Sequence, residues 1–136
     1  MIGDDQEHDQ FISDHRWASL TTLRRNGNPS TSLVAYARDG DEIVISTPGG
    51  TFKRSSIERD PRVSLCVISN QEHFNFVTIE GTATIESEDI LADTEKVFAN
   101  IEASGYPKPP NLPEWLEKQH RVIIRIKPER VSGVIR

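Results

Sequence analysis

The chain has 136 residues, of which 35% are hydrophobic, with a formal net charge of −5 and a single cysteine, Cys66. This length suits one domain with one core, and no apolar run approaches the ~20 residues that a membrane-spanning helix needs. Because one cysteine cannot form an internal disulfide and no apolar segment follows Met1, we expect a soluble cytoplasmic protein that does not associate with membranes.

Charge is unevenly distributed along the chain. Residues 1–14 contain five acids and no Lys or Arg, whereas residues 118–136 contain six bases and one acid, Glu129. A basic tail of this kind can meet an anionic cofactor, an acidic partner or nucleic acid, or can simply be a strand with a solvated face. We do not expect nucleic acid, since the whole chain is acidic and no aromatic residues are interleaved with these bases.

The first half predicts a short acidic segment and then three strands. Residues 1–15 form at most a short helix, and residues 16–136 are expected to form the main domain. Residues 17–24 are rich in β-forming side chains and end at Asn26-Gly27-Asn28-Pro29, a strong turn signal. Residues 30–38 and 42–47 are the next two strands, joined by a tight turn at Asp39-Gly40-Asp41. Connections this short make the strands antiparallel.

Residues 46–54, Ser-Thr-Pro-Gly-Gly-Thr-Phe-Lys-Arg, have the composition of a phosphate cradle. Gly49 and Gly50 allow backbone N–H groups to turn toward a ligand, and a helix that begins near Thr51 adds unpaired N–H groups. Lys53 and Arg54 then lie in the first helical turn, where the helix dipole disfavours cations unless an anion is bound. The alternative is an ordinary strand-to-helix loop with solvated charges.

The second half continues the sheet. A short helix over residues 52–58 is followed by a buried strand over residues 62–69. A long strand over residues 74–86 has a bulge or bend at Gly81. Residues 87–104 predict the one long helix, because an apolar stripe with helical spacing follows Ser87-Glu88-Asp89.

Four prolines lie within residues 106–113, so this segment cannot be regular structure. A turn of helix over residues 114–119 and a strand over residues 121–127 follow, and residues 129–135 extend that strand past a break at Pro128. These elements predict a mainly β fold, an antiparallel closed or split barrel of about six to seven strands with short helices.

No catalytic constellation is visible. The histidines, His8, His15, His73 and His120, lack metal-ligand spacing, so we expect no metal site. The glycine and serine motifs of hydrolases, Rossmann domains and P-loops are missing, and Cys66 lies in an apolar strand that favours an inert thiol. A phosphate site without an acid, base or nucleophile is typical of proteins whose bound cofactor carries the reaction, so a redox function leads.

Four segments carry a family resemblance: residues 17–23, 26–29, 46–54 and 57–65. In this order they resemble the pyridoxamine-phosphate-oxidase-like split-barrel superfamily, and within it the branch that uses the deazaflavin coenzyme F420. The resemblance covers residues 11–86 well and residues 121–133 moderately. It implies the FMN-binding split-barrel fold and a homodimer, with the cofactor in a cleft at the subunit interface.

The resemblance also implies the residues of the site. Those that hold the cofactor phosphate are Ser46, Thr47, Thr51, Lys53 and Arg54, through hydroxyl donors and charge-assisted hydrogen bonds. Ser32, Val34 and Tyr36 border the ring system, and Phe74 and Asn75 approach it, from the other subunit. Alternatively, residues 32, 34 and 36 simply share one face of their strand.

Three features depart from the family pattern. Ser56 stands where relatives commonly have Asn, Ser30 stands where they often have His, and the proline-rich loop has no counterpart. The resemblance nevertheless implies an F420-binding oxidoreductase that moves a hydride between the reduced deazaflavin and an unsaturated organic substrate.

Two alternatives share the fold: an FMN-binding oxidase or flavin reductase, and a non-catalytic carrier of a flavin or deazaflavin. An oligoglutamyl tail requires a basic channel beyond the phosphate, whereas FMN ends at the phosphate. Arg24, Arg25 and Lys127 are candidates for that channel by charge alone.

Overall fold

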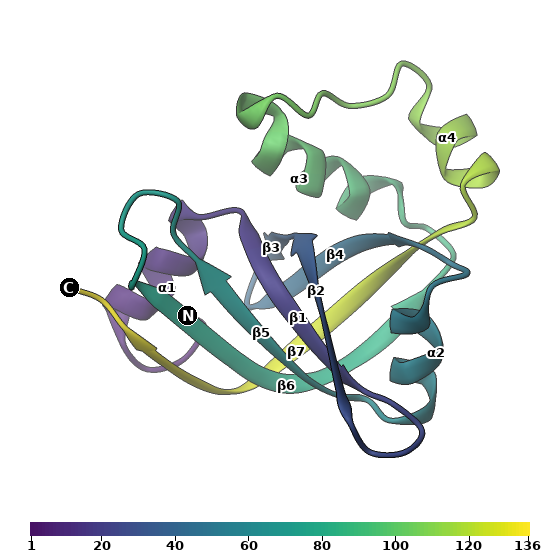
Figure 1. Ribbon diagram of the computed structural model, residues 1–136. Coiled ribbons are helices and arrows are strands. Elements are labelled where there is room, and N and C mark those ends of the chain that lie inside the picture. Colours follow the sequence, from purple (N-terminus) through teal and green to yellow (C-terminus); the bar gives the residue numbers. More distant parts are fainter.

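The computed structural model describes residues 1–136 and shows a seven-stranded antiparallel sheet with four short α-helices. In chain order the elements are α1 (Gln6–Asp14), β1 (Trp17–Leu23), β2 (Pro29–Ala35), β3 (Ala37–Asp39), β4 (Glu42–Pro48), α2 (Phe52–Arg59), β5 (Arg62–Ile68), β6 (Phe76–Glu86), α3 (Leu91–Ile101), a 3-10 turn (Glu102–Ser104), α4 (Leu112–Lys118) and β7 (Arg121–Val134). The prediction of a mainly β split barrel is confirmed (Figure 1).

The strands are ordered β2-β1-β5-β6-β7-β4-β3, and every pair is antiparallel. The sheet curls until β2 approaches β4 without pairing with it, and this gap is the split of the barrel. α3 and α4 lie together over one side of the barrel, and α2 follows β4 beside the gap (Figure 1). None of the helices has the length and apolar character needed to cross a bilayer.

Side chains on the two faces of the sheet form two separate apolar layers. On β4, Ile43 and Ile45 point into the barrel and join the main core, whereas Val44 points outward and packs with Ile123 and Val97 under α3. Successive residues of a strand face opposite sides, so each strand of this part of the sheet serves both layers. The consequence for the site is that Ser46 and Thr47 must also point in opposite directions.

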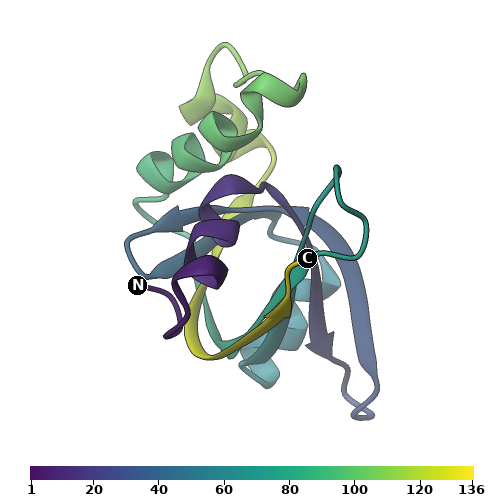
Figure 2. The ribbon, with the colours of Figure 1, turned by 90° about the vertical axis from the view of Figure 1, so that its left-hand side faces the viewer.

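The N-terminal segment closes one end of the barrel. Figure 2 shows α1 lying across that open end. Ile2, Phe11 and Ile12 are buried in the main core, and the hydroxyl of Tyr36 donates a hydrogen bond of 2.6 Å to the carbonyl oxygen of Ile12. The acidic segment is therefore packed against the strands.

Several predicted boundaries were wrong. α4 begins at Leu112, so the last two residues of the proline-rich segment are helical, because proline is tolerated in the first turn of a helix. The long strand β6 begins at Phe76, two residues later than expected. Residues 30–38 form two strands, β2 and β3, interrupted at Tyr36. α3 begins at Leu91, because Asp89 has a φ of +53°, which is incompatible with a helix start at Ser87. The predicted break at Pro128 is absent, and β7 runs unbroken through this residue. Pro128 lies opposite Gly81 at a register shift, which confirms the predicted bulge at Gly81. The bulge accommodates Pro128, which has no N–H to donate to the ladder.

Candidate functional site

The loop between β4 and α2 forms a cavity with the facing residues of β1 and β2. We call it the cradle cavity. It has a volume of about 310 Å³ and is lined by Thr22, Ser30, Ser32, Gly50, Thr51, Phe52 and Lys53. Thr22 lies opposite Ser30 in the β1–β2 ladder. These two strands contribute three hydroxyl groups, from Thr22, Ser30 and Ser32, and the loop contributes a fourth, from Thr51.

The electrostatics of the cradle cavity favour an anion. α2 begins at Phe52 with no side-chain cap and no acid in its first turn, because the Thr51 hydroxyl donates instead to the carbonyl oxygen of Pro48 at 3.1 Å. The first N–H groups of a helix have no partner within the helix and carry its positive dipole end. Lys53 adds a full charge and forms no ion pair.

A second cavity adjoins the first, and we call it the basic groove. It has a volume of about 510 Å³ and is lined by Arg24, Arg25, Asn26, Phe52, Ser55, Ser56 and Arg59. None of its three arginines forms an ion pair, and Arg59 donates only to the carbonyl oxygen of Leu23, at 3.2 Å. Lys127, the third candidate by charge, lies on β7 opposite Thr82 and lines neither cavity.

Phe52 is the residue that the two cavities share. Its side chain is 88% exposed, although large apolar side chains are ordinarily buried. An exposed aromatic ring between two cationic cavities is positioned to pack against the uncharged part of a ligand that occupies both.

The structure brings together three of the residues predicted for the phosphate and ring sites: Ser32, Thr51 and Lys53 line the cradle cavity. Arg54 lies beside it, with its Nη1 3.5 Å from the carbonyl oxygen of Gly49 and its Nε 3.5 Å from Glu58. Thr47 is buried, with 3% of its surface exposed, and lines neither the cradle cavity nor the basic groove.

Ser46 is on the opposite face of β4. Its hydroxyl accepts hydrogen bonds from Arg121 at 3.0 and 3.3 Å, and the Arg121 guanidinium stacks 4.5 Å above the ring of Trp115 on α4. This serine therefore faces the helical layer, away from the residues that line the cradle cavity.

The glycine pair of the loop has two different roles. The N–H of Gly49 donates to the carbonyl oxygen of His120 at 2.7 Å, and a Cβ at this position would lie 2.5 Å from that oxygen. The expectation that the Gly49 N–H turns toward a ligand was therefore wrong: β7 uses this group and leaves no space for a side chain. Gly50 has open space around it and lines the cradle cavity.

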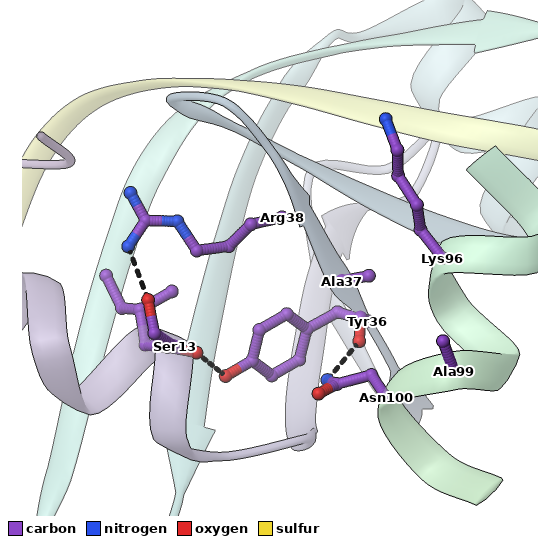
Figure 3. A pocket seen from close by; sticks show the side chains of 8 residues that line it. Ser13, Tyr36, Ala37, Arg38, Lys96, Ala99 and Asn100 are labelled. Atoms are coloured by element: carbon purple, nitrogen blue, oxygen red, sulfur yellow. Dashed lines mark hydrogen bonds between the residues drawn. The ribbon is translucent and has the colours of Figure 1, made fainter. Parts of the chain in front are cut away.

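Val34 and Tyr36, predicted to border the ring system, are associated with two further cavities. Val34 lines an apolar cavity of about 390 Å³ together with Trp17, Leu33, Ile68, Asn70, Ser104 and Tyr106. Tyr36 is fully buried, and burial raises the pKa of its hydroxyl well above the ordinary value. It forms part of a cavity of about 420 Å³ between α1, β3 and α3, in which Asn100 donates to the Tyr36 carbonyl oxygen (Figure 3).

Phe74 and Asn75 lie at the opposite end of the barrel from the cradle loop. Phe74 is 69% exposed under the guanidinium of Arg136, and the side-chain oxygen of Asn75 accepts the backbone N–H of Arg136 at 2.9 Å. Neither residue lines the cradle cavity or the basic groove.

Sequence reasoning missed several residues that line the two cavities, namely Thr22, Phe52, Ser55 and Arg59. The β1–β2 register was the available signal for Thr22. Once the turn at Asn26-Gly27 sets the pairing, Thr22 must lie opposite Ser30.

Comparison with known proteins identifies the family of this chain. Residues 4–135 match the family described as pyridoxamine 5'-phosphate oxidase. The chain belongs to that family. Within the pyridoxamine 5'-phosphate oxidase family, the chain is similar to an F420H(2)-dependent biliverdin reductase of Mycobacterium tuberculosis (strain CDC 1551 / Oshkosh), with 29% identity over 126 residues that cover 90% of this chain and 82% of the relative.

Solved structures share the fold of this family member. An F420 reductase matches with a TM-score of 0.79 at 20% identity, covering 95% of this chain and 98% of that one. A conserved hypothetical protein of Mycobacterium tuberculosis matches with a TM-score of 0.75 at 25% identity, covering 98% of this chain and 85% of that one.

Proposed function

We propose that this protein is an F420-binding oxidoreductase that transfers a hydride between the reduced deazaflavin and an unsaturated organic substrate. One observation carries the proposal: the cradle cavity and the basic groove are adjacent, and Phe52 lines both. A phosphate followed by an acidic tail fits that sequence of cavities. FMN ends at its phosphate and leaves Arg24, Arg25 and Arg59 without a role.

The similar proteins support the same cofactor. The biliverdin reductase of Mycobacterium tuberculosis and the F420 reductase both have F420 in their names. Neither name determines the substrate of this chain, so the proposal extends to a class of unsaturated organic acceptors.

In this proposal the residues of the chain bind and orient the cofactor. Lys53, the uncapped N–H groups of α2 and the hydroxyls of Ser30, Ser32 and Thr51 hold the phosphate by charge-assisted hydrogen bonds. Arg24 and Arg25 attract the acidic tail, and this binding energy, remote from the reacting carbon, can be used for orientation. The deazaflavin, when bound, supplies the hydride chemistry itself.

We further infer a homodimer with the cofactor at the subunit interface. A row of apolar side chains crosses the outer face of the sheet from β1 to β7: Trp17, Ile68, Phe76 and Val134 are neighbours in consecutive ladders. None of the four is fully buried, and Leu33 on β2 is 78% exposed. An apolar face of this kind supports the packing of a second barrel against it.

Titration of the purified protein with F420 and, separately, with FMN tests the proposal, with ligand fluorescence as the readout. F420 is expected to bind more tightly. The Lys53→Ala variant should lose about 1.5–3 kcal/mol of binding free energy, the scale of a hydrogen bond to a charged group. Lys118→Ala is the matched control, because Lys118 is an exposed lysine on α4, paired with Glu114.

Three outcomes are decisive. Tight FMN binding without F420 binding would replace the proposal by its flavin alternative. Unchanged affinity in Lys53→Ala would remove this lysine from the site. Tight F420 binding without oxidation of the reduced cofactor by any of a panel of enones, quinones and tetrapyrroles would make the protein a carrier.

A further inference from the structure

Arg54 is a cation of the cradle segment that has no part in holding the phosphate in the proposed function. It lies in the first turn of α2, next to Lys53, but only Lys53 lines the cradle cavity. The helix dipole disfavours a cation in this turn, because the N-terminus of a helix already carries partial positive charge. An acidic partner for Arg54 therefore offsets an unfavourable position.

That partner is Glu58, one helical turn further along α2. The Arg54 Nε lies 3.5 Å from the Glu58 carboxylate, and the Arg54 Nη1 lies 3.5 Å from the carbonyl oxygen of Gly49. Both distances exceed the length of a strong charge-assisted hydrogen bond, about 2.7–2.9 Å. The Arg54 and Glu58 side chains are 35% and 55% exposed, so water weakens their attraction. Arg54 is thus held loosely, beside an acid that a bound anion can replace.

The Arg54 guanidinium lies against the backbone of the cradle loop. A Cβ added to Gly49 would be 3.0 Å from the Arg54 Nη1, and the next residue, Gly50, lines the cradle cavity. Arginine side chains are long and have several staggered rotamers. A change of rotamer is the movement that would transfer the guanidinium from Glu58 to an anion in this cavity.

The positive charge available to a phosphate depends on which partner Arg54 takes. While Arg54 is paired with Glu58, Lys53 is the one full positive charge that lines the cradle cavity. A phosphate that continues into a tail is a diester with one negative charge. A terminal phosphate, like that of FMN, is a monoester with about 1.5 to 2 negative charges at pH 7. One cation matches the diester, and two cations match the monoester.

We propose that Glu58 is a specificity-determining residue, which holds Arg54 away from the cradle cavity and so favours a phosphodiester over a phosphomonoester. A dianion draws Arg54 from Glu58, and the loss of that ion pair lowers its net affinity. A monoanion binds to Lys53, the cavity hydroxyls and the α2 N–H groups without disturbing the pair. The resulting preference for F420 over FMN rests on the proposed function, whereas the selection between phosphate esters does not.

Dimethyl phosphate and methyl phosphate are the probes, added to the cofactor-free protein at about pH 8. Methyl phosphate is then a dianion, because the second pKa of a phosphomonoester is about 6. The NMR shifts of the Gly50 and Lys53 backbone amides report binding. In Glu58→Gln the dissociation constant of methyl phosphate should fall about fivefold, the scale of one exposed hydrogen bond to a charged group, and that of dimethyl phosphate less than about twofold.

A second set of variants separates the release of Arg54 from the simple loss of a negative charge. Glu58→Gln in an Arg54→Gln background should leave the ratio of the two dissociation constants unchanged, because no guanidinium is released. Asp60→Asn is the matched control for the lost charge, since Asp60 follows α2 directly and is paired with Arg62 instead. It should not change the ratio either.

Equal changes for the two esters in Glu58→Gln would overturn the proposal. The same selective change in the Arg54→Gln background or in Asp60→Asn would overturn it too, as would the absence of a saturable shift at Gly50 and Lys53 with either ester.

The two proposals fail separately. A selective gain for methyl phosphate in Glu58→Gln, without F420 binding to the parent protein, would leave the role of Glu58 and remove the proposed function. F420 binding without any change of ester selectivity in Glu58→Gln would do the reverse. Where both hold, Glu58→Gln tightens FMN binding about fivefold and F420 binding less than about twofold.

Discussion

Arg121 donates two hydrogen bonds to the hydroxyl of Ser46, at 3.0 and 3.3 Å, on the face of β4 that is turned toward α4. Arg121 has no acid partner, and burial lowers the pKa of its guanidinium. Ser46 therefore satisfies a partly buried cation that is otherwise supported only by stacking on Trp115. Its role is in the packing of α4 against the barrel.

Ser46→Ala is expected to lower the free energy of unfolding by about 1–2 kcal/mol, because Arg121 loses its only side-chain acceptor and solvent compensates in part. The affinity for F420 should not change, since Ser46 does not line the cradle cavity. Urea unfolding and the fluorescence titration measure the two quantities. Ser55→Ala, at an exposed position of α2, is the control for stability. A large loss of affinity in Ser46→Ala would place this serine in the binding site.

The cradle segment shows how far composition predicts a site. Its hydroxyls, glycines and cations predicted a cradle between a strand and a helix, and the segment does join β4 to α2 and line a cavity. Which hydroxyls face the cavity depends on the orientation of β4, and that could not be predicted. Ile43, Val44 and Ile45 are all apolar because each face of the strand packs against a layer, so the sequence carries no alternation from which to assign Ser46 and Thr47.

The basic groove depends on tertiary structure in a different way. Arg24 and Arg25 lie in the β1–β2 turn, whereas Arg59 ends α2, far along the chain. Only the curl of the sheet brings them together. Charge alone suggested Arg24 and Arg25, and it equally suggested Lys127, which lines neither cavity.

Gly49→Ala is expected to destabilise the protein by about 1–3 kcal/mol, the usual cost of overpacking. The new Cβ would lie 2.5 Å from the carbonyl oxygen of His120, and this is a backbone atom that cannot move aside without disturbing the start of β7. Gly50→Ala is the matched control. A Cβ at position 50 has no atom within 4 Å. This substitution should stabilise the protein by about 0.4–1 kcal/mol, because alanine lowers the conformational entropy of the unfolded chain. Equal melting temperatures for the two variants would contradict the close approach of β7.

Asp39 couples β3 to both α3 and β7. Its carboxylate accepts from Lys96 at 2.6 Å and from Arg125 at 2.8 Å, and these hydrogen bonds, Lys96 first, lower the pKa of Asp39. The pKa of Asp39 in the folded protein is therefore below its value in the unfolded chain, about 3.9. The ionised carboxylate stabilises the fold at pH values above about 3.9, and this stabilisation is lost as the pH falls through the pKa of the folded state.

Asp39→Asn should therefore lower the free energy of unfolding at neutral pH by about 1 kcal/mol, a modest amount because the carboxylate is about one third exposed. The difference from the parent protein should shrink below about pH 4, where the parent's carboxylate becomes protonated. Urea unfolding across the acid range measures it, with Asp4→Asn as a control at an exposed aspartate that forms no ion pair. A difference that stays constant with pH would show that charge is not its cause.

The double variant Arg24→Ala/Arg25→Ala distinguishes a cofactor that extends beyond its phosphate from one that ends there. The double variant should weaken F420 binding about tenfold at low ionic strength. The loss should be smaller at high salt, because exposed charges are screened over about 10 Å at 0.1 M. FMN binding should not change. Arg62→Ala is the control, because Arg62 is exposed and paired with Asp60 at 2.7 Å. Parallel losses for F420 and FMN would mean that these arginines act on the phosphate, and the basic groove would then no longer favour a deazaflavin over a flavin.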